Sequence, residues 1–430
     1  MIKDRLKEIK VIYYPYNMIK TAVSNIVYNI NYRSSLANIS RVKELARQKI
    51  ENHEVLKVVF IVQYIPSWNK YEPIYEKMKK DGRFDPVILC VPSNIQDGKL
   101  IGDRVNDTYE YFTSHGYEAI DSLGEGDEWF DLEAISPDYV FHSRPYNSFM
   151  PNCYSSEEIS KYALIGNVIY GTNLTENGQD VTLNRDYFKD VYVYFAFDKG
   201  EEQYYKNRFR PGIEKGIQKC LPYGRIGLEQ MMDVKREKTS SDFRKTVIWT
   251  PRWSTDPYIG GSNFFNYKDT MTELARSFRD ILFIFRPHPL MFDNFINTGE
   301  MSREEVDEFK QYCNDESNIL LDESKEYTDT FWNSDILISD SSGIIPEYFV
   351  TEKPVLFCHS NVPYVFTDYA KAMIKSSYEV RNEKDLIGYF NDLINNNDYK
   401  LPERQACIAE YFGDVSNSSD LIIDFLAEGI

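Results

Sequence analysis

The chain has 430 residues, a hydrophobic fraction of 42% and a formal net charge of −18 at pH 7. This length predicts two domains of ordinary size, each with its own core. The acidic balance argues against nucleic acid as a partner, because nucleic-acid binding requires a basic surface. No apolar stretch approaches the ~20 residues of a membrane span.

The five histidines and six cysteines show no metal-ligand spacing, so we expect neither a metal site nor a cofactor. The cysteines are scattered without a Cys-x-x-Cys pair, and no signal peptide precedes them. We therefore expect reduced, mostly buried thiols in a cytoplasmic protein rather than a disulfide framework.

Residues 1–50 differ from the rest of the chain in charge. They hold 10 of the 49 Lys and Arg but only 3 of the 67 Asp and Glu. The segment is predicted to be a basic amphipathic helix that Pro15 breaks or kinks. Such a helix can lie on an anionic membrane surface, here the inner face of the plasma membrane, or pack on its own domain or a partner subunit. The tyrosines beside Lys10 and Lys20 slightly favour the membrane.

Residues 51–232 are predicted to form a first α/β domain. The apolar run 57–64 is long enough for a buried parallel strand. Strands and helices then alternate, which predicts a doubly wound sheet. Further strands are expected at 86–91, 138–142, 164–170 and 191–197, and helices at 68–80 and 104–115.

A linker is predicted at 222–227 together with the charged stretch 233–245. The second α/β domain, residues 246–402, follows, and residues 403–430 are expected to form one helix that crosses back to the first domain. Helices within the second domain are expected at 267–278, 302–314 and 327–333.

The segment from Ser334 to Glu347 predicts a short strand, a small-residue turn and the start of a helix. The turn Ser341-Ser342-Gly343 offers backbone N–H groups, and Pro346 suits the first helical turn. A phosphate fits such a helix N-terminus. Alone, this unit is ordinary in any α/β domain.

Two further strand ends carry basic groups. The apolar run 280–285 passes into Arg286-Pro287-His288-Pro289, where each proline makes the preceding residue extended. Arg286 and His288 should therefore point the same way, as a pair suited to a phosphoryl group. Arg252 follows the run 246–250 in the same manner. Because ligands bind beyond the carboxyl ends of parallel strands, these segments predict a nucleotide-diphosphate pocket.

These segments resemble the CDP-glycerol glycerophosphotransferases, which build teichoic acids and related polymers. The resemblance rests on 286–289, on 335–342 followed by Glu347, and on 352–357, with weaker similarity at 138–141 and 144–146. It implies a GT-B fold, with two Rossmann-like domains facing a cleft. It also implies transfer of glycerol phosphate or a similar alditol phosphate from a CDP-activated donor, with release of CMP. The acceptor would be a hydroxyl of a glycan or lipid-linked precursor of a cell-wall or capsule polymer.

The chain departs from the family at one position. Where the family has His-Gly-Thr, with the histidine taken as catalytic base, this chain has Tyr170-Gly171-Thr172. A tyrosine with an unperturbed pKa of ~10 is a poor base at neutral pH. The base is therefore an open question.

His288 is our candidate for the proton donor to the leaving CMP oxygen, its rival role being a structural hydrogen bond. Glu347 is assigned to the ribose hydroxyls by the resemblance, or else it complements the helix dipole. For the base our candidate is His142, which ends a predicted strand and so could face the cleft, with Tyr170, Asp180 and Glu176 as alternatives. The other interpretation of His142 and Arg144 is a surface His-Ser-Arg-Pro loop. The expected donor-binding residues are Arg252, Arg286, Ser339, Asp340, Ser341, Ser342, Gly343 and Glu347, and the expected acceptor-binding residues are Arg144 and Thr172.

Two other functions use the same pocket. A GT-B glycosyltransferase with a nucleotide-sugar donor would make a glycoside instead of a phosphodiester. A non-catalytic family member would bind the nucleotide without turnover, which Tyr170 leaves open.

Overall fold

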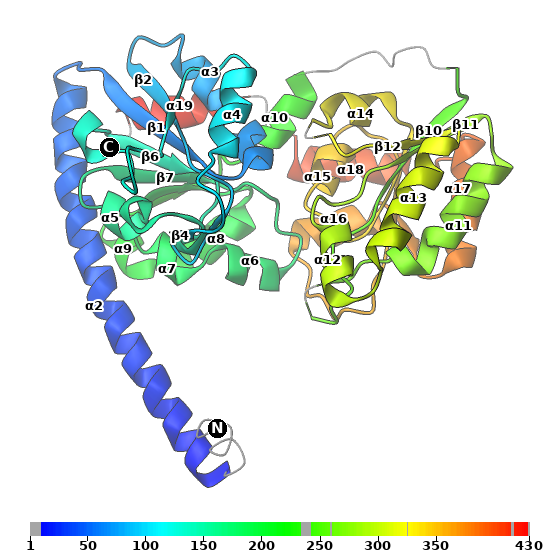
Figure 1. The fold of residues 1–430 in the computed structure, drawn as a ribbon, viewed down its shortest axis with the longest axis horizontal. Coiled ribbons are helices and arrows are strands. Elements are labelled where there is room, and N and C mark those ends of the chain that lie inside the picture. Colours follow the sequence, from blue (N-terminus) through cyan, green and yellow to red (C-terminus); the bar gives the residue numbers. More distant parts are fainter. Residues whose placement is uncertain (1–9, 234–241, 259, 325, 414–416, 429–430) are drawn as a thin grey trace.

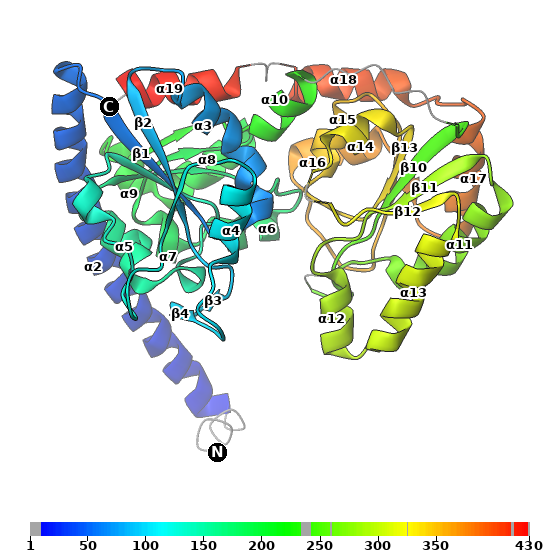
Figure 2. The same ribbon diagram turned by 45° about the horizontal axis from the view of Figure 1, so that its top comes forward.

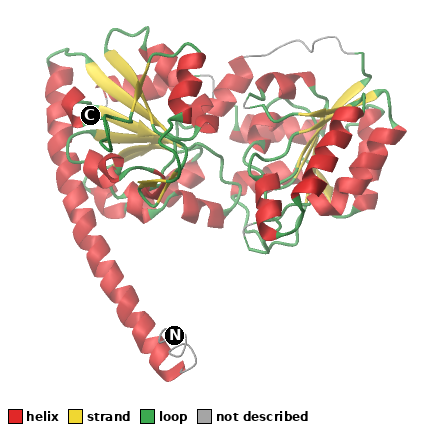
Figure 3. Ribbon diagram, viewed as in Figure 1, coloured by secondary structure: helices red, strands yellow, loops and turns green. Residues whose placement is uncertain are grey.

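The computed structural model describes residues 10–233, 242–258, 260–324, 326–413 and 417–428. They form two α/β domains side by side, with a long N-terminal helix projecting from the first (Figure 1). Each domain has a central parallel sheet with helices on both faces (Figure 3). The α/β class and the two doubly wound sheets expected from the sequence are confirmed.

The first domain contains a seven-stranded parallel sheet in the order β5-β2-β1-β6-β7-β8-β9. The strand order reverses between β1 and β6, so the carboxyl ends of these strands open a crevice there. The strands are β1 Leu56–Val62, β2 Phe84–Cys90, β5 Ala119–Asp121, β6 Tyr139–His142, β7 Leu164–Val168, β8 Val191–Phe195 and β9 Lys219–Leu221.

Short helices and turns connect these strands, together with the small hairpin β3 Ile95–Gln96 and β4 Lys99–Leu100. The helices are η1 Ile65–Lys70, α3 Glu72–Met78, α4 Asp107–Ser114, η2 Glu133–Ile135, η3 Asn147–Phe149, η4 Asn152–Tyr154, α5 Ser156–Ile159, α6 Glu176–Thr182, α7 Arg185–Phe188, α8 Lys199–Arg208, α9 Arg210–Glu214 and α10 Ile226–Asp233.

The second domain contains a six-stranded parallel sheet in the order β12-β11-β10-β13-β14-β15, with its reversal between β10 and β13. The strands are β10 Lys245–Thr250, β11 Ile281–Phe285, β12 Ile319–Leu321, β13 Ile336–Ser339, β14 Val355–Cys358 and β15 Tyr378–Val380. The helices are α11 Phe264–Ser277, α12 Met291–Thr298, α13 Arg303–Asp315, α14 Thr328–Asn333, α15 Ile345–Phe349, α16 Asp368–Lys375 and α17 Glu383–Ile394.

The two domains share part of their apolar core. Phe197 of the first domain packs against Tyr369 and Phe412 of the second part of the chain, with ring centroids 5.3 and 6.2 Å apart. All three side chains are buried. Since apolar burial is the main stabilising contribution in a protein core, this cluster favours one fixed arrangement of the domains.

The N-terminal helix α2 runs from Lys10 to Glu51 without a break. A break at Pro15 is therefore wrong, and a kink there stays a prediction. Proline removes one hydrogen bond and its ring crowds the carbonyl four residues earlier, but neither effect ends this long helix. From Tyr32 onward the helix packs on the first domain, where Tyr32, Leu36 and Ile39 are buried in its cores.

The C-terminal segment crosses back to the first domain as expected, but as two helices, α18 Leu401–Tyr411 and α19 Ser418–Glu428 (Figure 2). Helix α19 packs against α3, and Tyr139 donates a 3.0 Å hydrogen bond to the carbonyl of Leu426. Most of the predicted charged linker, residues 234–241, lies outside the described residues. In the part of the chain that is described, no helix combines the length and apolar character needed to cross a membrane.

Candidate active site

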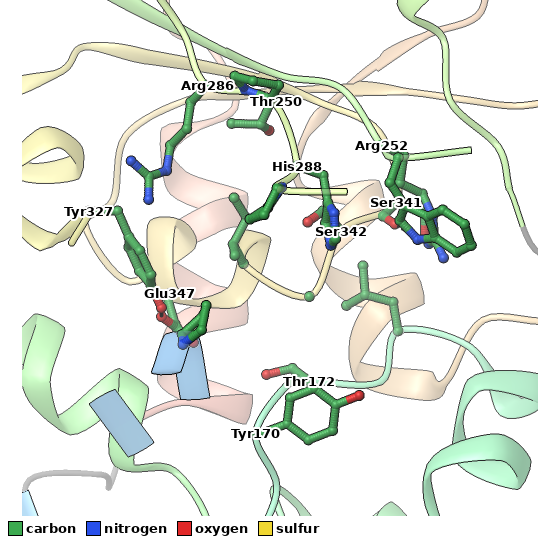
Figure 4. Close-up of a pocket in the computed structure, with 18 of the residues that line it drawn as sticks. Tyr170, Thr172, Thr250, Arg252, Arg286, His288, Tyr327, Ser341, Ser342 and Glu347 are labelled. Carbon is green, nitrogen blue, oxygen red and sulfur yellow. Dashed lines mark hydrogen bonds between the residues drawn. The ribbon is translucent and has the colours of Figure 1, made fainter. Parts of the chain in front are cut away.

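A cavity of about 480 Å³ lies between the two domains, at the carboxyl ends of both sheets. The second domain contributes basic and hydroxyl groups from three strand ends, and the first contributes the loop 170–175 (Figure 4). Its size is in the usual range for a small-molecule site. Of the predicted residues, Tyr170, Thr172, Arg252, Arg286, His288, Ser341, Ser342, Gly343 and Glu347 line it.

The turn after β13 is held from beneath by Asp340. This buried carboxylate accepts hydrogen bonds from the backbone N–H groups of Arg252 and Asn263, at 2.8 and 3.1 Å, and from the Asn263 side chain at 2.7 Å. Burial raises its pKa to about 6. Ser339 is also buried, 2.8 Å from the Thr250 hydroxyl. Asp340 and Ser339 therefore shape the turn from outside the cavity.

Arg286 lies in the cavity wall as predicted, and its position is set by β12 and the loop that follows. Its guanidinium is 2.5 Å from the carboxylate of Asp322 and donates to the carbonyl of Ser324 at 2.8 Å. Burial alone would raise the pKa of Asp322, but hydrogen bonds from Ser324 and the charge of Arg286 hold it below its usual value. Sequence reasoning missed Asp322, although it directly follows an apolar run, as the other site residues do.

His288 is neutral at physiological pH in this cavity. Burial, together with the nearby charge of Arg252, lowers its pKa to about 4. The backbone N–H of Leu290 donates to its Nδ1 at 3.2 Å, so Nε2 carries the ring proton. The ring thus presents a fixed N–H donor, which suits a phosphate oxygen.

Arg252 and Ser341 lie at the same end of the cavity (Figure 4). Its guanidinium donates a 2.5 Å hydrogen bond to the Ser341 carbonyl and lies 5.9 Å from the ring centroid of Tyr364. These contacts fix the cation beside the turn. Positive charge on this side favours an anionic ligand.

Glu347 takes part in a buried contact between the domains. Lys70 of η1 lies 2.5 Å from one of its carboxylate oxygens, and Tyr327 donates a hydrogen bond to the other. Burial would lower the pKa of Lys70, but attraction to Glu347 and Tyr327 raises it above its ordinary value. Gly227 packs over this pair, where a Cβ would lie 2.3 Å from the Lys70 ammonium. Lys70 is a site residue that no sequence motif indicated.

The loop with Tyr170 approaches the phosphate-binding turn closely. A Cβ on Gly343 would lie 2.8 Å from the Thr172 carbonyl, so only glycine fits there. Beyond Thr172 the loop pairs with the second domain, since Thr175 forms a β-bridge with Phe366. Burial and the neighbouring Tyr146 raise the pKa of Tyr170 well above its usual value, so its hydroxyl stays neutral.

His142 does not face the cleft, contrary to our expectation. It is fully buried, with Nδ1 3.0 Å from the Tyr187 hydroxyl and Nε2 2.9 Å from the Tyr154 carbonyl. Burial lowers its pKa to about 4. The strand β6 does end at the crevice, but at its last residue the side chain turns into the helical layer. His142 is therefore a structural residue.

The remaining candidates also lie outside the cavity lining. The Arg144 guanidinium lies 4.0 Å from the ring centroid of Phe149 and 4.7 Å from that of Tyr64, which does line the cavity. Asp180 is exposed and paired with Arg208 at 2.8 Å, and Glu176 is exposed. Arg144 thus supports the cavity wall from behind.

Two Rossmann-like domains that face a shared cavity, with C-terminal helices returning to the first domain, define the GT-B class. Solved structures with this fold agree. MnaA from S. aureus in complex with UDP is 14% identical, with a TM-score of 0.55 over 86% of this chain and 96% of that one. The UDP-GlcNAc 2-epimerase from Neisseria meningitidis bound to UDP-GlcNAc is 14% identical, with a TM-score of 0.53 over 86% and 99%. The wall teichoic acid polymerase TagF is 14% identical, with a TM-score of 0.50 over 96% and 98%.

A family model matches the second half of the sequence. Residues 225–426 match the family described as CDP-Glycerol:Poly(glycerophosphate) glycerophosphotransferase. This match covers the second domain and the C-terminal helices, and it agrees with the resemblance found in the sequence. No curated protein sequence matches the chain significantly.

Proposed function

We propose that this protein transfers glycerol phosphate, or a similar alditol phosphate, from a CDP-activated donor to a hydroxyl of a glycan or lipid-linked acceptor and releases CMP. The observation that carries the proposal is the joint presence of Arg286, His288 and the Ser341–Gly343 turn in one interdomain cavity. The family match over the same residues supports it.

In this reaction the acceptor oxygen attacks the phosphorus that bears the alditol, and the bond to the CMP oxygen breaks. Negative charge grows on the leaving and equatorial oxygens, where fixed donors and cations are most effective. Arg286 and Arg252 supply positive charge, the turn supplies backbone N–H groups, and His288 Nε2–H donates to the leaving oxygen.

On the acceptor side, a neutral Tyr170 positions the hydroxyl rather than deprotonating it. The raised pKa of Tyr170 leaves almost no phenolate at pH 7. A loose phosphoryl-transfer transition state places little demand on a base, because bond formation to the acceptor is slight at that point. The proton of the acceptor hydroxyl then leaves late in the step, to an oxygen of the transferred phosphate or to water. Arg144 acts indirectly, by supporting Tyr64 in the cavity wall.

The test is incubation of the full chain with CDP-glycerol, CDP-ribitol and UDP-GlcNAc, with the released nucleotide identified by chromatography and binding of CMP, CDP and UDP measured by calorimetry. We expect CMP release from a CDP-alditol and tighter binding of CMP or CDP than of UDP. Release of UDP from UDP-GlcNAc would establish a glycosyltransferase instead. Nucleotide binding without any release, with a lipid-linked glycan acceptor present, would indicate a non-catalytic member.

A lipid-linked acceptor would lie in a membrane, and the N-terminal helix α2 has an exposed apolar face that could contact one. Val23, Ile26, Val27 and Ile30 lie on one face of α2 and are each more than half exposed. No acidic residue occurs between Glu8 and Glu44. We propose that this face rests on an anionic membrane surface, where a lipid-linked acceptor would also be found.

A further inference from the structure

A second cavity, of about 180 Å³, opens beside the main one in the second domain. It lies beyond the carboxyl end of β14, under the loop that follows that strand. Its walls include Ser341, Phe357, His359, Ser360, Tyr364 and Phe366.

Ser341 lines both cavities and so marks the point where they meet. Its side chain is only 5% exposed, and its hydroxyl has no hydrogen-bond partner among the residues that the structure describes. A buried hydroxyl without a partner costs free energy, so a ligand group that bonds to it is favoured. The unpartnered hydroxyl indicates that a polar ligand group reaches the junction.

The order of groups along the main cavity says which part of a donor would arrive there. Glu347 and Tyr327 lie at one end, His288 and Ser342 in the middle, and Arg252 and Ser341 at the other end (Figure 4). A nucleoside at the Glu347 end places the diphosphate in the middle. The group beyond the second phosphate then extends past Ser341 toward the second cavity.

The second cavity has the chemistry of a polyol site. His359 is held 2.9 Å from the carboxylate of Glu379, Ser360 contributes a hydroxyl, and Phe357 packs edge-on against the His359 ring. Tyr364 is fixed by a 2.5 Å hydrogen bond to the Gly260 carbonyl. Short polar groups beside aromatic walls suit the hydroxyls and methylenes of an alditol. The cavity volume of about 180 Å³ is also many times the ~10–15 Å³ that one water needs.

We propose that this second cavity binds the alditol chain of the donor, and that its depth sets which alditol is accepted. The inference rests on the proposed function, because it takes the donor to be a nucleoside diphosphate alditol. It assigns a specificity role to the residues of the loop after β14 that line the second cavity, and these belong to none of the motifs in the sequence.

The test is a substitution that places a larger side chain in the second cavity. Val362 lines the second cavity but not the first, whereas Val365 on the same loop is 49% exposed and lines neither. Val362→Phe should weaken binding of CDP-glycerol and CDP-ribitol at least ~10-fold, or about 1.4 kcal/mol, and leave CMP affinity within about 2-fold. Val365→Phe should change none of these. Calorimetry on the full chain, without acceptor, measures all three ligands.

Ser360→Ala removes a hydroxyl without adding bulk and guards against a folding defect in Val362→Phe. It should weaken CDP-ribitol more than CDP-glycerol, because the longer chain reaches deeper. Equal loss of CMP and CDP-alditol affinity in both variants would place the nucleoside in this cavity and overturn the inference. Unchanged CDP-alditol affinity would overturn it as well. If the unaltered protein binds CMP but neither CDP-alditol, the proposed function itself fails.

Discussion

His288 combines a fixed tautomer with a position in the middle of the cavity, so it should act in the chemical step. We expect His288→Ala to lower the turnover of a CDP-alditol by ~100-fold or more, with a much smaller change in nucleotide affinity. His288→Gln keeps an N–H donor at the end of the side chain and should recover part of the rate. Steady-state kinetics and calorimetry separate the two effects. A large loss of affinity with unchanged turnover would make His288 a binding residue only.

His142, in contrast to His288, is assigned a structural role: it stabilises the fold. Its pKa is lowered from 6.5 to about 4, so below pH 6.5 the unfolded chain binds a proton that the folded protein does not. The stabilising contribution of His142 is thus present at pH 7 and is lost progressively as the pH falls toward 4. At pH 7, His142→Ala should cost about 1–3 kcal/mol, because Tyr187 and the Tyr154 carbonyl lose their partner.

The difference in unfolding free energy between the unaltered protein and His142→Ala should therefore narrow from pH 7 to pH 5, as measured by urea denaturation. The exposed His115, changed to Ala, serves as the control and should have little effect at either pH. A constant difference would mean that His142 keeps its ordinary pKa. Loss of turnover without loss of stability would return His142 to the list of catalytic candidates.

Among the elements, the turn between β13 and α15 depends on glycine at one position. Gly343→Ala would bring a methyl group to 2.8 Å from the Thr172 carbonyl and 3.2 Å from its backbone nitrogen. Either the turn or the Tyr170 loop must then move, and we expect at least a ~10-fold loss of nucleotide affinity, about 1.4 kcal/mol. Gly388→Ala, in α17, meets nothing within 4 Å and is the matched control. That substitution should stabilise the protein slightly, by roughly 0.5–1 kcal/mol, because alanine favours a helix. Equal nucleotide affinity in both variants would show that the loop and the turn move apart freely.

Strand order and strand ends explain how much of the site could be predicted. Alternating apolar runs fix the parallel sheets, and residues at their carboxyl ends, such as Arg286 and Ser341, must then share one edge. Lys70 could not be found this way. It lies in a 3-10 helix of the other domain, and its pairing with Glu347 depends on how the domains dock. His142 failed for a local reason, since the face of a strand's last side chain depends on twist and on the layer it meets.

The contacts between domains bear on how the whole molecule works. Three contacts join the two domains: the Lys70–Glu347 pair, the Thr175–Phe366 bridge and the packing of Phe197. A ribose that binds Glu347 must compete with Lys70 and Tyr327, which occupy both of its oxygens. Since breaking a buried ion pair is costly, we expect donor binding at Glu347 and the docking of the two domains to be coupled through this carboxylate.

The projecting half of α2 is the part of the molecule that we expect to contact a membrane. Residues 32–46 are tied into the first domain, so removing residues 1–50 would damage the core and could not test membrane binding. The combined change of Val23, Ile26, Val27 and Ile30 to Ser removes only exposed side chains. We expect it to abolish sedimentation with vesicles containing phosphatidylglycerol and to leave CMP affinity and thermal stability unchanged.

Leu45→Ser, also exposed but on the half of α2 that packs on the domain, should sediment like the unaltered protein. Binding of the unaltered protein should weaken at high salt, because the basic residues act through screened electrostatic attraction. The membrane proposal fails if the fourfold variant still sediments with the vesicles. If, in addition, the unaltered protein is a dimer and the variant is a monomer, the apolar face pairs two copies of the chain.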